Sequence, residues 1–235
     1  MSRKYLIKKG GFTLIEVLLA SAIFAGVSMV TFATISQVAA FQYKAVESRQ
    51  TAQEAREIAD MITRAVREAK GDTKLVIDPS IATYSSGVMM FSCASSVCVR
   101  INSDSPREGG ANTLVTFSKD NYRIFVISNG AMYYSSGSNT GDINNAVVGT
   151  QLNTTITAIL ADSSKIISKA SHSVAGGFNG YTPRDESANK QQPFIDFSII
   201  SETKDYNSVS ANQRARSTIQ STVTSRNYDK VNSSL

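Results

Sequence analysis

The polarity of the chain changes twice before residue 71. A short basic stretch is followed by an apolar run over residues 12–40, in which Glu16 is the single charged side chain. An amphipathic segment then continues to residue 70 without Pro or Gly after Gly26, and Gly71 is a typical helix stop. The pattern predicts one helix over residues 12–70, about 85–90 Å long at 1.5 Å per residue.

The second half of this predicted helix has a stripe of small and apolar residues at three- and four-residue steps. These residues are Ala45, Ser48, Ala52, Ala55, Ala59, Ile62, Val66 and Ala69. The other faces carry the charged residues Glu47, Arg49, Glu54, Arg56, Glu57, Arg64 and Arg67. We therefore expect the stripe to pack against a folded domain.

Beyond Gly71 short runs of β-branched and aromatic residues predict antiparallel strands. They lie at residues 74–78, 88–92, 97–102, 113–118, 122–128, 131–134, 154–160, 194–201 and 218–225. Asn129-Gly130 between two apolar runs predicts a hairpin turn. The Ser-, Gly- and Asn-rich stretches 135–150 and 170–192 are typical of surface loops. The predicted fold class is α+β, with a long N-terminal helix packed on an antiparallel β-sheet domain.

The net charge of +5 is concentrated at the N-terminus. Four of these charges come from Arg3, Lys4, Lys8 and Lys9. The rest of the chain is nearly neutral, which does not favour a nucleic-acid-binding surface. Basic residues before an apolar run predict a cytoplasmic N-terminus and an extracytoplasmic chain after residue 40. The run is longer than a secretory signal core and no small-residue cleavage site follows it, so we expect a membrane-inserted helix.

The sequence GGFTLIEV at residues 10–17 resembles the processing signature of type IV pilins and pseudopilins. The resemblance implies that a prepilin peptidase cleaves after Gly11 and that Phe12 becomes the N-methylated terminus. It also implies four regions: a cleaved basic leader (1–11), a transmembrane and assembly half of the helix (12–40), an amphipathic half (41–70) and an extracytoplasmic β domain (71–235).

Elementary chemistry supports these residue types. Gly11 lacks a side chain that would obstruct a protease, and the freed amine of Phe12 lies one helical turn from Glu16. Each charge is costly alone in a low-dielectric setting, and pairing offsets much of that cost. The family implies that Glu16 meets the terminal amine of a neighbouring subunit. The alternative is an uncleaved signal anchor with an accidental Glu.

The resemblance points to a structural subunit with no enzymatic activity and no cofactor. Many major pilins have a helix-kinking Pro in the apolar half, where this chain has Ala33 and only Gly26 as a weak point. That departure favours a minor pilin or a type II secretion-like pseudopilin. Residues 215–227 have a weaker similarity to the last strand of larger minor pilins.

The implied partners are prepilin peptidase, other pilins or pseudopilins, the inner-membrane assembly platform and the lipid bilayer before assembly. The implied location is the inner membrane with a cytoplasmic N-terminus, and then the filament. An alternative is a tip-located adhesin or DNA-uptake pilin whose β domain binds DNA or a surface ligand. An envelope enzyme on an uncleaved anchor is a third alternative, for which the sequence offers no reactive constellation.

Other candidate sites lie in the β domain. Cys93 and Cys98 bracket four residues between two predicted strands, which suits a hairpin disulfide, with two free thiols as the alternative. A metal site would need further ligands. His172 is the single histidine and is expected to be a solvated loop residue.

Two further patterns have plain interpretations. An oxygen-rich stretch lacks the acidic density of a calcium site and is expected to be a flexible loop; it comprises Gly137, Asn139, Asp142 and Asn144. A basic C-terminal end is more typical of a solvated face than of a DNA contact; it comprises Arg214, Arg216, Arg226 and Lys230.

Overall fold

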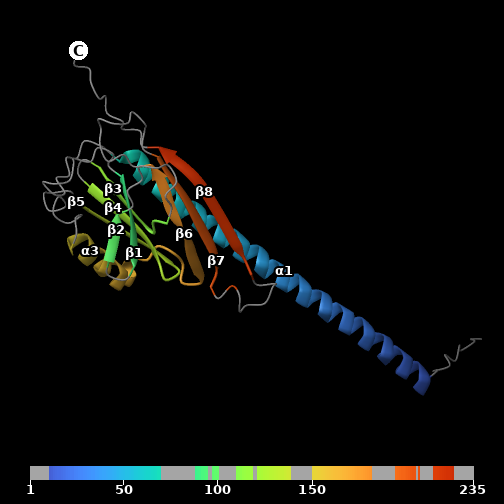
Figure 1. The fold of residues 1–235 in the computed structure, drawn as a ribbon. Coiled ribbons are helices and arrows are strands. Elements are labelled where there is room, and N and C mark those ends of the chain that lie inside the picture. The colour runs from blue at the N-terminus through green and yellow to red at the C-terminus, as the bar shows by residue number, and fades with distance from the viewer. Residues whose placement is uncertain are drawn as a thin grey trace, which may run out of the picture.

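The structure is a computed structural model. It describes residues 11–69, 88–94, 97–100, 110–118, 121–138, 150–181, 194–204, 206 and 214–224. One long helix runs beside a domain of two antiparallel sheets, and its N-terminal half projects away from that domain (Figure 1). The α+β class with a long helix on antiparallel sheets is therefore confirmed.

The long helix, α1, spans Leu14–Glu68 and agrees with the predicted helix. It begins at Thr13, whose Oγ1 accepts a hydrogen bond from the Glu16 N–H at 3.3 Å. It passes through Gly26 without a break and ends at Ala69, which has an extended backbone. The apolar first half is exposed, because no described part of the domain covers it.

The second half of α1 packs against β7 and β8 and contributes to the main core. Its buried residues are Thr51, Glu54, Ala55, Ile58, Ala59, Ile62, Ala65 and Val66. The predicted stripe is right for five positions, namely Ala55, Ala59, Ile62, Val66 and Ala69. It is wrong for Ala45 and Ser48, which are exposed. Glu54, which the pattern placed on a face other than the stripe, is also buried and is only 2% exposed.

The first sheet has five strands in the order β2-β1-β3-β4-β5. Their bounds are Val88–Ala94 (β1), Val97–Arg100 (β2), Thr113–Phe117 (β3), Asn121–Ser128 (β4) and Ala131–Ser138 (β5). Asn129 and Gly130, with φ of 50° and 73°, form the predicted turn between β4 and β5. Positive φ angles at both central residues are typical of the tight turns that connect hairpin strands. The predicted strand at 74–78 lies outside the described residues.

The second sheet has three strands in the order β6-β7-β8. Their bounds are His172–Tyr181 (β6), Phe194–Thr203 (β7) and Arg216–Thr224 (β8). Along β7 buried residues alternate with half-buried ones, so that Ile195, Phe197 and Ile199 face the core. A backbone bridge between Ala111 and Phe178 connects this sheet with the segment before β3.

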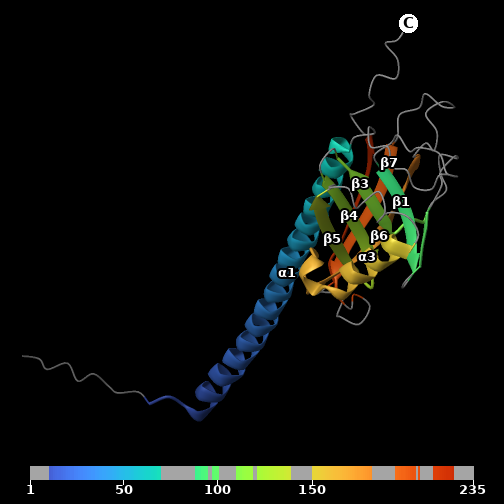
Figure 2. The ribbon, with the colours of Figure 1, turned by 90° about the vertical axis from the view of Figure 1, so that its left-hand side faces the viewer.

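Between β5 and β6 the described chain contains a helix, α3 (Thr150–Ala161), and a short 3-10 helix, η1 (Ser163–Lys165). In Figure 2 both lie at the end of the domain nearest the exposed half of α1. Ile156 and Ile159 of α3 are buried in a smaller core against the five-stranded sheet. Residues 154–160, which we expected to form a strand, are therefore helical. The three-residue step between these isoleucines places both on one helix face, and this packing overrides the β propensity of Thr and Ile.

The predicted loop at 170–192 is also wrong, because it contains β6. Its glycines belong to the sheet: at Gly176, where φ is +140°, a Cβ would collide with the carbonyl oxygen of Ser198 on β7. The backbones of β6 and β7 approach so closely that only Gly fits. The predicted loop at 135–150 begins too early, since β5 continues to Ser138.

Candidate functional site

The predicted cleavage point lies in exposed backbone just ahead of α1. Gly11 and Phe12 are non-helical, and the Phe12 side chain is 82% exposed. Among the described residues, nothing lies within 4 Å of the position that a Cβ on Gly11 would occupy. The bond between these residues is therefore open to a protease.

Glu16 is exposed in the first turn of α1, where the helix dipole favours a negative charge. The Glu16 N–H donates to the backbone oxygen of Thr13 at 3.0 Å and also contacts its hydroxyl. Thr13 thus fixes where the helix starts relative to Phe12 and Glu16. Thr13 was not among the predicted site residues, although T-x-x-E before an apolar run is a recognised helix-start pattern.

The projecting half of α1 is covered with exposed large apolar side chains. They include Leu14, Ile15, Val17, Leu18, Phe24, Val30 and Phe32, each more than half exposed. By length and composition α1 could cross a membrane.

The prokaryotic N-terminal methylation motif matches residues 7–30. The chain is type IV pilin-like. Comparison with curated proteins and with solved structures gave no match. The motif implies processing by prepilin peptidase and assembly with other pilins. An apolar N-terminal helix with this motif fits a pilin that is anchored in the membrane before assembly.

In this pilin-like chain a buried polar cluster joins α1 to the β domain. His172 Nδ1 lies 2.6 Å from Glu54 Oε2, and the Ser201 hydroxyl donates to the same oxygen at 2.5 Å. The Lys169 backbone N–H donates to Glu54 Oε1 at 2.6 Å. The other ring nitrogen of His172 lies 3.4 Å from Glu47 Oε2. We call Glu47, Glu54, His172 and Ser201 the Glu54 cluster.

The placement of His172 corrects our expectation of a solvated loop residue. Its side chain is fully buried, at the first position of β6. A buried carboxylate requires hydrogen-bond donors, and His172 supplies one from across the helix–sheet interface. No local signal in the sequence connects the two residues, because 118 positions separate them.

The Glu54 cluster does not have the geometry in which a base activates a nucleophile. Ser201 and His172 both contact Glu54 Oε2, so no described hydrogen bond passes from Ser201 to His172 to a carboxylate. Although Glu47 and Glu54 both contact His172, no group of three His, Cys, Asp or Glu side chains within the described part of the chain could hold a metal ion.

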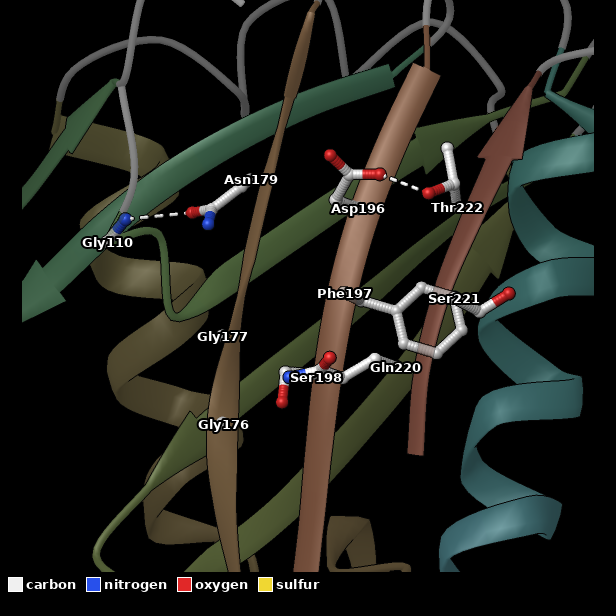
Figure 3. Close-up of a pocket in the computed structure, with 10 residues that line it drawn as sticks. All are labelled: Gly110, Gly176, Gly177, Asn179, Asp196, Phe197, Ser198, Gln220, Ser221 and Thr222. Carbon is white, nitrogen blue, oxygen red and sulfur yellow. Dashed lines mark hydrogen bonds between the residues drawn. The ribbon is translucent and has the colours of Figure 1, made fainter. Parts of the chain in front are cut away.

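A shallow groove of about 610 Å³ lies on the polar face of the three-stranded sheet (Figure 3). The Gly110 N–H donates to Asn179 Oδ1 at 3.1 Å. The Thr222 hydroxyl donates to Asp196 Oδ1 at 2.5 Å across β7 and β8. Other polar residues of its lining are Ser198, Gln220 and Ser221.

Cys93 is disulfide-bonded, and the β1–β2 register places it opposite Cys98, the second cysteine of the chain. Two hydrogen bonds with the Asn112 side chain also hold the Cys93 backbone, at 2.8 and 2.6 Å. These contacts locate the β1–β2 hairpin against the segment before β3.

The structure describes only some of the remaining candidate residues. Gly137 lies in β5, whereas Asn139, Asp142 and Asn144 lie outside the described residues. Arg214 lies over the Tyr206 ring, 5.5 Å from its centre. Arg216 Nε is 3.9 Å from Glu202 Oε2. Arg226 and Lys230 are outside the described residues.

Proposed function

We propose that the chain is a structural subunit, a minor pilin or pseudopilin, of a type IV pilus or type II secretion-like filament. Prepilin peptidase cleaves the precursor after Gly11, and the amino group of Phe12 is methylated. The mature subunit assembles through α1, and Glu16 pairs with the Phe12 amine of a neighbouring subunit.

One observation carries this proposal: an exposed scissile segment, an acidic first helical turn and an uncovered apolar helix follow one another directly. Phe12 and Glu16 are separated by about one helical turn, and the apolar surface beyond them has no partner in the described domain. Lipid covers that surface before assembly and sister helices cover it in the filament.

The proposed topology follows from the charge distribution. Residues 1–11 lie in the cytoplasm, residues 12–40 in the inner membrane, and the domain after α1 outside the cytoplasm. The amphipathic half of α1, over residues 41–70, holds the domain through the Glu54 cluster. We propose no enzymatic activity, a view supported by the way His172 and Ser201 share one acceptor oxygen.

Mass spectrometry of the mature N-terminus tests the processing step. The expected N-terminal peptide begins with N-methyl-Phe12. The matched variant Gly11→Val is expected to accumulate as precursor, because its side chain obstructs the protease. Functional filaments in which Met1 through Gly11 remain attached would contradict the proposal.

A second candidate function is ligand binding by the β domain at a filament tip. The observation that favours it is the polar groove on the three-stranded sheet, lined by Asn179, Asp196 and Gln220. DNA has less support as the ligand, because Arg214 and Arg216 contact Tyr206 and Glu202 of the same chain. Saturable glycan binding by the full-length protein that is lost in Asp196→Ala would support this role. If no saturable binding is found, only the scaffold function remains supported.

A further inference from the structure

The groove on the three-stranded sheet is built around two polar side chains on neighbouring strands. Asn179 of β6 and Asp196 of β7 are directly opposed in the register of the two strands. Both side chains therefore stand on the same face of the sheet, with Cβ atoms about 4.5–5.5 Å apart. We call this groove the Asn179–Asp196 groove.

Each of the two side chains is oriented by one hydrogen bond within the protein (Figure 3). The Gly110 N–H engages Asn179 Oδ1 and leaves the amide nitrogen of Asn179 unused. The Thr222 hydroxyl engages Asp196 Oδ1, and the other oxygen of Asp196 is directed away from Thr222. Within the described part of the chain, neither that oxygen nor the Asn179 nitrogen has a hydrogen-bond partner. An oriented acceptor and an oriented donor are thus available side by side.

The next row of residues across the sheet extends this polar surface. Gly177, Ser198 and Gln220 form that row on the same face, because each lies two residues from a member of the first row. Gly177 has no side chain and leaves the surface hollow, whereas Ser198 and Gln220 add a hydroxyl and an amide. The volume of the groove, about 610 Å³, is in the range of small-molecule sites.

The charge of the lining disfavours polyanions. No Lys or Arg is among its described residues, and Asp196 is the single charged residue among them. Nucleic acids and acidic glycans would be repelled by this carboxylate and would find no cation. Phe197, the one aromatic residue of the described lining, belongs to the main core and is 3% exposed. No ring is therefore available on which a base could stack.

The groove also does not suit an extended peptide, which binds a sheet by pairing with a free strand edge. β7 is bonded to β6 on one side and to β8 on the other. On the far side of β6, the Phe178 N–H donates to the Ala111 oxygen at 2.8 Å. Among the described contacts, the floor of the groove thus offers a peptide no free edge.

We propose that the Asn179–Asp196 groove binds an uncharged glycan through neighbouring hydroxyl groups. Every sugar hydroxyl both donates and accepts, so adjacent hydroxyls donate to Asp196 and accept from Asn179. Because both protein groups are already oriented, binding does not have to order them. The inference rests on the proposed ligand-binding role of the β domain, which it narrows to neutral sugars and to one pair of residues.

Binding of the full-length protein to a glycan array tests the proposal. The detergent is a polyoxyethylene ether, which has no sugar group. The array contains neutral oligosaccharides, their sialylated and sulfated forms, and an alanine tetrapeptide as a probe without sugar. Titration with the neutral glycan that binds most strongly then compares the affinities of the variants.

The test variants preserve the shape of the groove. Asp196→Asn keeps the oxygen that accepts from Thr222 and places an amide nitrogen where the free acceptor was. Asn179→Asp keeps the oxygen that accepts from Gly110 and removes the free donor. The matched control is Glu202→Gln, which removes a carboxylate from the same face of β7 outside the described lining of the groove. Circular dichroism verifies that all forms are folded.

The wild type and Glu202→Gln are expected to bind neutral glycans saturably and more tightly than the acidic forms. Asp196→Asn is expected to bind roughly tenfold less tightly, because a hydrogen bond to a charged group is lost. Asn179→Asp loses a neutral donor, which is expected to weaken binding about threefold or more.

Equal binding by all forms, or a preference for sialylated or sulfated glycans, would overturn this inference and leave ligand binding by the β domain standing. Saturable binding of the peptide alone would overturn the sugar as the ligand. No saturable binding by any form would overturn the inference together with the ligand-binding role. The N-terminal mass of the same preparation shows whether Phe12 is methylated, so the pilin function is judged independently.

Discussion

Glu54 of α1 and His172 of β6 meet at 2.6 Å inside the protein although 118 positions separate them in the sequence. The same carboxylate accepts hydrogen bonds from Ser201 of β7 and from the Lys169 backbone. One side chain of the long helix is thus tied to three segments of the domain. Because a helix of apolar and small residues can slide or rotate against a sheet, these directional contacts fix its position.

Glu54→Ala is expected to lower the free energy of unfolding by about 3–5 kcal/mol, because it leaves buried donors without an acceptor. Urea unfolding of the full-length protein in detergent measures the change. Glu57→Ala is the matched control, since Glu57 is exposed on the same helix and should change stability by no more than about 0.5 kcal/mol. Equal effects of the two variants would contradict the anchoring role of Glu54.

A double-mutant cycle tests the contact between Glu54 and His172 directly. His172→Ala, Glu54→Ala and the double variant are expected to give a coupling free energy of about 1–3 kcal/mol, since the side chains share one hydrogen bond. Pairing Glu57→Ala with His172→Ala should give additive losses. Additivity for Glu54 as well would mean that the two residues stabilise the protein independently.

The parts of the structure that were predictable are those with a local signal. The unbroken amphipathic pattern predicted α1, and Asn129-Gly130 predicted the β4–β5 hairpin. Glu54 was assigned to a face other than the packing stripe, because helix periodicity alone does not identify a buried charge whose donors come from β6 and β7. His172 was assigned to a loop because the glycines of β6 look like turn residues, whereas β7 requires them.

Gly176→Ala is expected to destabilise the domain by about 1–3 kcal/mol or more, because its φ of +140° strains any other residue and the new Cβ would collide with Ser198. Gly177→Ala is the control: its Cβ would lie 3.1 Å from the Ala111 oxygen, a contact that a small shift relieves. Thermal unfolding followed by circular dichroism compares them. A larger loss for Gly177→Ala would contradict the close approach of β6 and β7.

Replacing Cys93 and Cys98 together with Ser is expected to cost about 2 kcal/mol, because the loop between them is short. The hairpin should persist, since the Asn112 side chain still holds the Cys93 backbone. The thermal midpoint of the variant should equal that of the wild type in reductant. Unfolding of the whole domain on reduction would show that the disulfide has more than a local role.

Glu16→Gln and Glu16→Ala separate processing from assembly. Both variants keep Gly11 and Phe12 in exposed backbone, so mass spectrometry should still find N-methyl-Phe12. Assembly should fail, because each incorporated subunit would place an ammonium group in a low-dielectric helix bundle without its carboxylate partner. An unpaired charge in that setting costs about 2.5–3.5 kcal/mol, which corresponds to a loss of incorporation on the order of 100-fold.

The control for this experiment is Glu57→Gln, which removes a carboxylate from the exposed, membrane-distal part of the same helix. It should be processed and incorporated like the wild type. Immunoblots of membrane and sheared-filament fractions measure the distribution of each variant. Glu16→Asp shortens the side chain while keeping its charge, and it should recover part of the incorporation that Glu16→Gln loses. Equal incorporation of Glu16→Gln and Glu57→Gln would show that subunits select their axial register without the amine–carboxylate pair.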